Sequence, residues 1–210
     1  MRKNGIFILL SLIMFALSAC GGEQPYEETF DEPGTWRVGD DVDVNGQIVD
    51  GVYDMLMKAD DALIWTTAGE SFTDGVYQVE ATQVAGPLNN GYGMLLRLDD
   101  DKDDFYVFKI SGDGYVWIGR YLGGGAETDV LVGDWWFESP AVQQGLNKTN
   151  TLRVNAEGGN MIFFVNGQEV GRVTDNTLAR GDIGLWLESF GKGGVQIQSD
   201  HVTVQPLEKE

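Results

Sequence analysis

Apolar and polar residues alternate with a period of two along most of the chain after residue 28. Clusters of Gly, Asp and Asn separate these segments, which is the pattern of many β-strands joined by turns. Almost no window has the spacing of an amphipathic helix. We therefore predict an all-β fold, with strands at residues 47–57, 62–67, 75–83, 91–98, 104–111, 115–122, 150–156, 161–165, 168–174, 181–190 and 193–206.

Two turn sequences predict antiparallel hairpins. Asn166 and Gly167 stand between two apolar runs, and Asn-Gly in that setting is the strongest short-range hairpin signal. Gly112, Asp113 and Gly114 can supply the positive φ angles of a three-residue loop. Each turn should join two neighbouring strands of the same sheet.

The register of the second hairpin predicts two different faces. A three-residue loop pairs Phe108 with Ile118 and Lys109 with Trp117, and paired residues of an antiparallel ladder share a face. Tyr121 then lies on the side of Lys109. One face of this sheet should be apolar, and the other should mix aromatic and charged side chains.

The chain begins with the three parts of a secretory signal. Arg2 and Lys3 precede an apolar run over residues 6–17, and small residues follow it. This run is shorter than the ~20 apolar residues that a bilayer-spanning helix needs. We expect a signal peptide over residues 1–19.

Residues 17–20 read Leu-Ser-Ala-Cys, and this segment resembles the lipobox of bacterial lipoproteins. The resemblance implies cleavage before Cys20 and attachment of lipid to that residue. Cys20 is the only cysteine in the sequence, so no disulfide can form within the chain. We expect a lipidated tether at residues 20–28, a β-sandwich domain at residues 29–207, and a place in the cell envelope on the extracytoplasmic face.

The chain is strongly acidic, with a formal net charge of −19. Loss of Arg2 and Lys3 with the signal peptide would change this value to −21. Such a field repels nucleic-acid phosphates and anionic lipid headgroups. We therefore expect no nucleic-acid partner, and membrane attachment through the lipid on Cys20.

Several short motifs occur in a recognisable order after residue 28. They are Thr29-Phe30-Asp31, Trp36, Gly51-Val52-Tyr53 and the segments at residues 75–80, 91–97, 105–108, 151–154, 164–167 and 181–186. Together they resemble the concanavalin A-like lectin/glucanase family, and within it the laminin-G-like and 3-keto-disaccharide hydrolase-like branch. The resemblance implies a two-sheet antiparallel jelly-roll sandwich whose concave face or rim loops bind sugars, with frequent structural calcium.

A sugar site needs an aromatic platform and a few polar groups that bond hydroxyls. The mixed face of the hairpin offers both, if neighbouring strands contribute to it. The candidate ligand-binding residues are Gln78, Arg97, Lys109, Trp117, Tyr121 and Trp186. The alternative is that Trp117 and Trp186 pack into the core or under a loop, because Trp is highly buried on average.

A second candidate region is the stretch at residues 133–146, which has no clean period and is expected to be a long connection. Trp135 and Trp136 are adjacent in it and cannot both point inward on a short extended segment. An exposed tryptophan would make this stretch another place for a ligand or partner.

Catalysis has weak support in the sequence. Retaining glycosidases need two carboxyl groups ~5 Å apart, which enzymes of this fold place on one strand as Glu-x-Asp-x-Glu or a close variant. The sequence has no such triplet, which leaves Glu80 and Glu188 as candidates on separate strands. His201 is the only histidine, so a Ser-His-Asp arrangement has little to work with.

The acidic run at residues 99–104 is the one candidate cation site. Asp99, Asp101 and Asp103 could offer carboxylate oxygens to calcium, a hard cation that prefers such ligands. The alternative is a solvated turn between two strands. No other cofactor is expected.

These observations favour a surface-anchored, non-catalytic and carbohydrate-binding β-sandwich. One alternative is a glycoside hydrolase-like enzyme that acts on a di- or polysaccharide through Glu80 and Glu188. Another is an envelope interaction or structural lipoprotein without a small ligand, favoured if residues 133–146 cover the mixed face.

Overall fold

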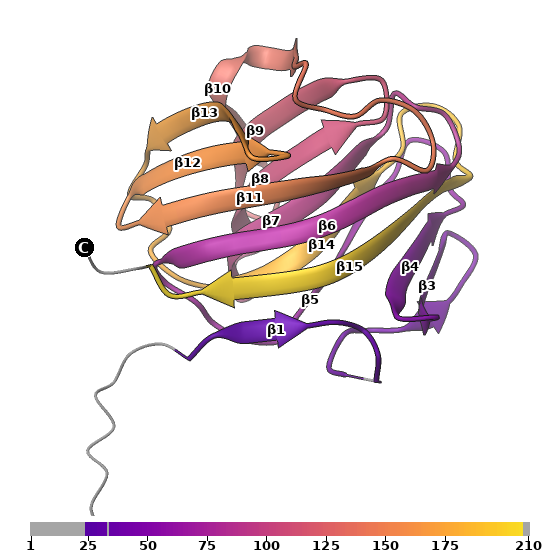
Figure 1. Ribbon diagram of the computed structural model, residues 1–210, viewed down its shortest axis with the longest axis horizontal. Helices are drawn as coiled ribbons and strands as arrows, with labels where there is room; N and C mark the ends of the chain where they lie inside the picture. The colour runs from indigo at the N-terminus through magenta and orange to yellow at the C-terminus, as the bar shows by residue number, and fades with distance from the viewer. Residues whose placement is uncertain (1–23, 33, 208–210) are drawn as a thin grey trace, which may run out of the picture.

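Fifteen β-strands form two stacked antiparallel sheets in the computed structural model, which describes residues 24–32 and 34–207 (Figure 1). The predicted all-β jelly-roll sandwich is confirmed. Within the described ranges, no helix is long and apolar enough to cross a membrane.

The larger sheet has nine strands. Their order is β13 (Gln168–Thr174), β12 (Asn160–Val165), β11 (Thr149–Glu157), β6 (Gly75–Ala85), β15 (Val195–Gln205), β4 (Val52–Met57), β3 (Val44–Val49) and β2 (Gly39–Asp40), and β1 (Tyr26–Glu28) also pairs with β15. Figure 1 shows this sheet in front, with β6 and β15 at its centre.

The smaller sheet has six strands. Their order is β10 (Glu127–Glu138), β9 (Tyr115–Leu122), β8 (Asp104–Ser111), β7 (Gly91–Asp99), β14 (Asp182–Glu188) and β5 (Leu63–Thr67). Most of it lies behind the larger sheet in Figure 1.

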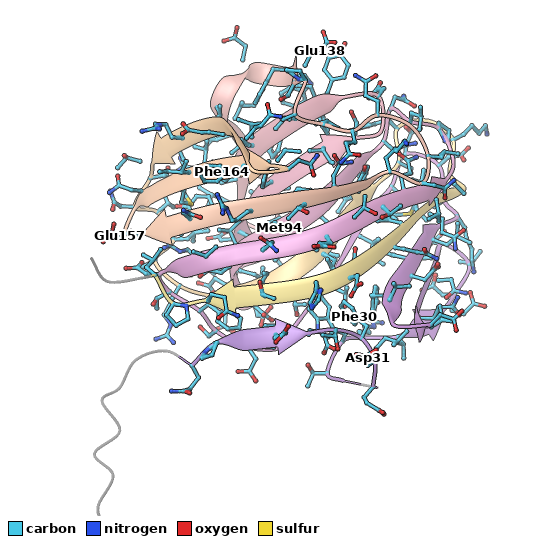
Figure 2. The ribbon with its side chains drawn as sticks, viewed as in Figure 1. Phe30, Asp31, Met94, Glu138, Glu157 and Phe164 are labelled. Atoms are coloured by element: carbon cyan, nitrogen blue, oxygen red, sulfur yellow. The ribbon has the colours of Figure 1, made fainter. Side chains whose placement is uncertain are left out.

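The sandwich core follows from strand alternation in both sheets. On β6, Tyr77 and Val79 are buried while Gln78 and Glu80 between them remain partly exposed. Buried side chains from both sheets form one apolar cluster, which includes Tyr77 from the larger sheet and Phe108 from the smaller. Figure 2 shows the side chains that project from the front sheet toward the viewer.

The two predicted hairpins are confirmed. Val165 pairs with Gln168 across Asn166 and Gly167, whose φ angles are 50° and 79°. Lys109 pairs with Trp117 across the other loop. Both hairpins have the register that their sequences indicate, and of the two glycines in the second loop Gly114 has a positive φ, 103°, while Gly112 does not.

Three parts of the chain differ from the prediction. Residues 47–57 are two strands and not one, because Asp50 and Gly51 both adopt positive φ and turn the chain back from β3 into β4. Part of the predicted tether is β1, since Tyr26–Glu28 pairs with β15. No strand was predicted between residues 122 and 150, but β10 covers Glu127–Glu138 and so includes the first residues of the expected connection at 133–146.

Candidate ligand-binding site

The smaller sheet carries a second apolar cluster on the face turned away from the larger sheet. Phe105, Trp117 and Trp186 belong to this cluster, whereas Phe108 and Ile118 belong to the core between the sheets. Strand alternation therefore sends the two sets to opposite sides, as the hairpin register predicts. We call the surface around Phe105, Trp117 and Trp186 the outer aromatic face.

A buried ion pair crosses the centre of the outer aromatic face. Lys109 Nζ on β8 lies 2.7 Å from Glu188 Oε1 on β14, although β7 runs between these two strands. Gly93 pairs with Lys109 in the ladder, and a Cβ atom on Gly91 would come within 2.1 Å of Glu188 Oε1. Glycine on β7 thus leaves the space in which the carboxylate lies.

Aromatic rings surround the Lys109 ammonium. Nζ lies 4.3 Å from the ring centroid of Trp117, and 5.3 Å from each of those of Trp136 and Trp186. These contacts are cation–π interactions in a site with little water. Burial lowers the pKa of Lys109, and the Glu188 charge opposes that effect.

Burial has the opposite effect on Tyr121, because it disfavours the phenolate. Desolvation raises the pKa of Tyr121 to about 12, with a smaller contribution from the charge on Glu188. This phenol is therefore neutral at physiological pH and available as a hydrogen-bonding group.

An enlarged bulge in β10 partly covers this face. Val132 pairs with Ile118 and Phe137 pairs with Val116, so residues 133–136 stand opposite Trp117 alone. The extra residues leave the ladder and carry their tryptophans over the sheet. Trp136 packs against the buried cluster, whereas Trp135 is 58% exposed.

Three clefts lie along the outer aromatic face. The Trp135 cleft, about 290 Å³, is lined by Asn89, Ser111, Asp113, Tyr115, Trp135, Trp136 and Phe190. The Glu188 cleft, about 180 Å³, is lined by Asp61, Ala62, Leu63, Glu188, Ser189 and Phe190. The Tyr121 cleft, about 240 Å³, is lined by Leu63, Trp65, Asp103, Phe105, Tyr121, Gly124, Gly125 and Trp186.

Four of the six predicted ligand-binding residues lie together on this face. They are Lys109, Trp117, Tyr121 and Trp186. Trp117 and Trp186 are each 1% exposed and Lys109 is 2% exposed, so these three form the base of the face. The expectation that Trp117 is an open platform is wrong, because the bulge at residues 133–136 and its neighbours cover it.

The predicted place of Gln78 on this face is wrong. β6 belongs to the larger sheet, and Gln78 lies on the outer side of that sheet, opposite Arg153 and Thr203. Gln78 points to the expected side of β6, opposite Tyr77 and Val79, but β6 belongs to a different sheet from the one predicted. Local pattern shows which residues of a strand share a face, while long-range pairing decides which sheet the strand joins.

The predicted place of Arg97 is also wrong. Leu96 and Leu98 pair with the consecutive residues Ile183 and Asp182, so Arg97 is an extra residue in β7 with a φ of 57°. This bulge interrupts the alternation. The Arg97 side chain is fully buried away from the outer aromatic face, as its hydrogen bonds below show.

The two weak catalytic candidates lie on different sheets. Glu80 is on β6, where it pairs with Thr151 and Asp200, and Glu188 is on β14 beside Lys109. They cannot share a substrate in the geometry of a glycosidase, which needs both carboxyl groups at one bond. This pairing of Glu80 with Glu188 is therefore wrong.

The three aspartates proposed for calcium do not converge. Asp99 pairs with Lys102 at 2.8 Å and accepts a hydrogen bond from the Asp101 backbone, and the Asp103 side chain lines the Tyr121 cleft. Among the residues that the structure describes, no group of three or more His, Cys, Asp or Glu side chains is arranged to hold a metal ion. The predicted lipidation site, Cys20, lies outside the described residues.

Sequence reasoning missed two residues that line the clefts, Phe190 and Tyr115. Phe190 is 44% exposed and Tyr115 is 39% exposed. Tyr115 follows Gly114 at the start of β9, and Phe190 lies between Ser189 and Gly191 just after β14, where exposed aromatic side chains have no fold role to explain them. An exposed aromatic at a loop was the signal that could have found them.

The chain has the fold of jelly-roll β-sandwiches of the concanavalin A-like and galectin-like type. No protein-family model matches the chain, and no curated protein sequence matches it significantly.

Three solved structures illustrate the likeness. A carbohydrate-binding module from Bacillus subtilis is 17% identical, with a TM-score of 0.57 over 85% of this chain and 93% of its own. A Bacillus licheniformis beta-glucanase is 12% identical, with a TM-score of 0.63 over 88% and 99%. A lichenase from a mouse hindgut metagenome is 14% identical, with a TM-score of 0.62 over 88% and 100%. The likeness establishes the fold.

Proposed function

We propose that this protein is a non-catalytic glycan-binding module held at the cell surface by lipid. The observation that carries the proposal is the Trp135 cleft. It presents three exposed aromatic side chains, Trp135, Tyr115 and Phe190, beside the polar groups of Asn89 and Asp113.

Aromatic rings with adjacent polar groups suit sugars, because a pyranose has an apolar face and a rim of hydroxyls. Trp136 beneath the cleft is fixed by its edge-on contact with Phe190, at 6.3 Å between ring centroids. A pre-arranged aromatic surface reduces the entropy that binding must overcome. The buried Lys109–Glu188 pair supports this surface from below.

A non-catalytic role is supported by the placement of the two candidate carboxylates. Glu188 is buried in an ion pair with Lys109, 2.7 Å from its ammonium, and no second candidate carboxylate stands at its side. Glu80, the other candidate, lies on the far sheet. The Bacillus subtilis carbohydrate-binding module shows that this fold is compatible with such a role in another protein.

Trp135→Ala is expected to weaken glycan binding at least tenfold, a loss of about 1.4 kcal/mol, because truncation removes an exposed stacking surface. The test is calorimetric titration of the full chain in detergent against a panel of oligosaccharides, with product analysis of each sample. Because the proposed module does not cleave its ligand, the product analysis should recover each oligosaccharide at its original length.

The matched control is Phe164→Ala. This aromatic side chain lies on the opposite surface of the molecule, on the front sheet in Figure 2, beneath the guanidinium of Arg153. Binding should not change in this variant. Equal loss in the Phe164 and Trp135 variants, or no sugar bound by the unaltered protein, would contradict the proposal.

Attachment to a membrane is the second part of the proposal. It is supported by the Leu-Ser-Ala-Cys segment at residues 17–20 and by the start of the fold at Tyr26, shortly after Cys20. Cys20→Ser should move the protein from the membrane fraction to the soluble fraction of fractionated cells. Unchanged fractionation would show that another feature holds the protein.

A further inference from the structure

Resting on the proposed function, we infer that the three clefts form one continuous site for a non-acidic oligosaccharide of at least three sugar units. The inference concerns the length and charge of the ligand. It follows from the residues that the clefts share and from the charges that line them.

Shared residues make the clefts a single series. Phe190 lines both the Trp135 cleft and the Glu188 cleft, and Leu63 lines both the Glu188 cleft and the Tyr121 cleft. Both side chains are exposed, Phe190 by 44% and Leu63 by 46%. Phe190 and Leu63 are therefore two apolar dividing residues, each of which lies between two adjoining clefts.

Hydrogen bonds hold the backbone of Phe190, the first dividing residue, in place. The Phe190 backbone N–H donates to Asn90 Oδ1 at 2.7 Å, and Asn90 is itself fully buried. The flanking residues are also held, since Ser189 N–H donates to the Ala62 carbonyl and Gly191 N–H donates to Asp61 Oδ1. An exposed aromatic side chain on a restrained backbone is suited to ligand contact, because binding costs it little conformational entropy.

Polar groups of the clefts suit hydrogen-bonding ligands. Glu188 is 5% exposed and lines the middle cleft, where its carboxylate is paired with the Lys109 ammonium. The indole N–H of Trp186, which lines the third cleft, has no acceptor. Hydroxyl groups of a sugar can both donate and accept such bonds.

The lining charges select against acidic ligands. Apart from Glu188, whose charge is paired with Lys109, each cleft carries one carboxylate: Asp113 in the first, Asp61 in the second and Asp103 in the third. No Lys, Arg or His lines any of the three within the described ranges, and the whole chain has a net charge of −19. A uronic-acid chain would meet like charge along its length, whereas neutral and amine-bearing sugars would not.

The experiment titrates the full chain with glucose, glucosamine and galacturonic-acid oligosaccharides of matched lengths, from one unit upward, at low ionic strength. Affinity for the neutral or amine series should rise about tenfold with each unit up to the third and then level off. The uronic series should bind at least about tenfold more weakly at every length, and added salt should narrow the gap.

Variants show which of the two dividing residues produces each gain in affinity. Phe190→Ala should remove the gain from the second unit, and Leu63→Ala should remove only the gain from the third. Val42→Ala is the control, because Val42 is 85% exposed and lines none of the three clefts. It should leave the length dependence unchanged.

The outcomes separate this inference from the proposed function. Binding that is independent of length, or tighter for the uronic series, overturns the inference while Trp135→Ala can still test the glycan site. Absence of binding to any neutral, amine-bearing or acidic sugar overturns both.

Discussion

Lys109→Met is expected to lower the free energy of unfolding by about 3–5 kcal/mol, because it leaves the Glu188 charge buried without a partner. The two side chains of this ion pair are 3% and 6% exposed, and their separation is 2.7 Å. The loss of cation–π contacts with Trp117 and Trp186 adds to the effect. Urea unfolding monitored by tryptophan fluorescence measures the change.

Two further variants test the cause of that loss. Lys102→Met removes a lysine of similar pairing distance, 2.8 Å to Asp99, whose side chain is 66% exposed. Because water screens this pair, the variant should lower the free energy of unfolding far less than Lys109→Met does. Adding Glu188→Leu to Lys109→Met should restore most of the stability, because the stranded charge is then gone. Equal losses in the two lysine variants would contradict the stated role of burial.

Arg97→Leu is expected to cost about 4 kcal/mol or more, since it removes the charged donor from the backbone carbonyls of Gly158 and Leu178 and the partner of Asp74. The guanidinium donates to the carbonyls of Gly158, Leu178 and Thr73 at 2.8 to 3.2 Å, and pairs with Asp74 at 3.3 Å. It thereby joins loops from distant parts of the chain. Thermal and urea unfolding should both show the loss.

Arg172→Leu is the matched control for that substitution. Its guanidinium pairs with Glu169 at 2.7 Å but is 68% exposed, so water can replace the contact, and the expected loss of stability is far smaller than that of Arg97→Leu. Arg97→Lys should remain well below the unaltered protein in stability, because one ammonium cannot reproduce the fork of donors. Full stability of Arg97→Leu would show that the loops do not depend on this side chain.

Strand positions were largely predictable, because each depends on a local pattern. β9 and β13 have the predicted bounds, and the Asn166-Gly167 turn and the pairing of Lys109 with Trp117 follow from turn chemistry and period-two alternation. The Asp50-Gly51 turn carried the same kind of signal and was overlooked inside a longer apolar run.

The candidate site was predictable only in part. Alternation correctly placed Lys109 and Trp117 on one side of their hairpin, but it could not show that the Trp136 ring lies over them. Nor could it show that Arg97 is an extra residue in its strand, since a bulge depends on how two neighbouring strands pair.

By itself, the sequence determined most of the strands, although not β1, β2 or β10. It also determined the two hairpin turns and the side of each strand that faces a given neighbour, because these properties depend on residues close together in the chain. Only the tertiary structure decided that Gln78 lies on the other sheet, that Glu188 meets Lys109 across β7, and that Phe190 and Leu63 divide one groove. Each of these depends on contacts between segments far apart in sequence, which local periodicity does not encode.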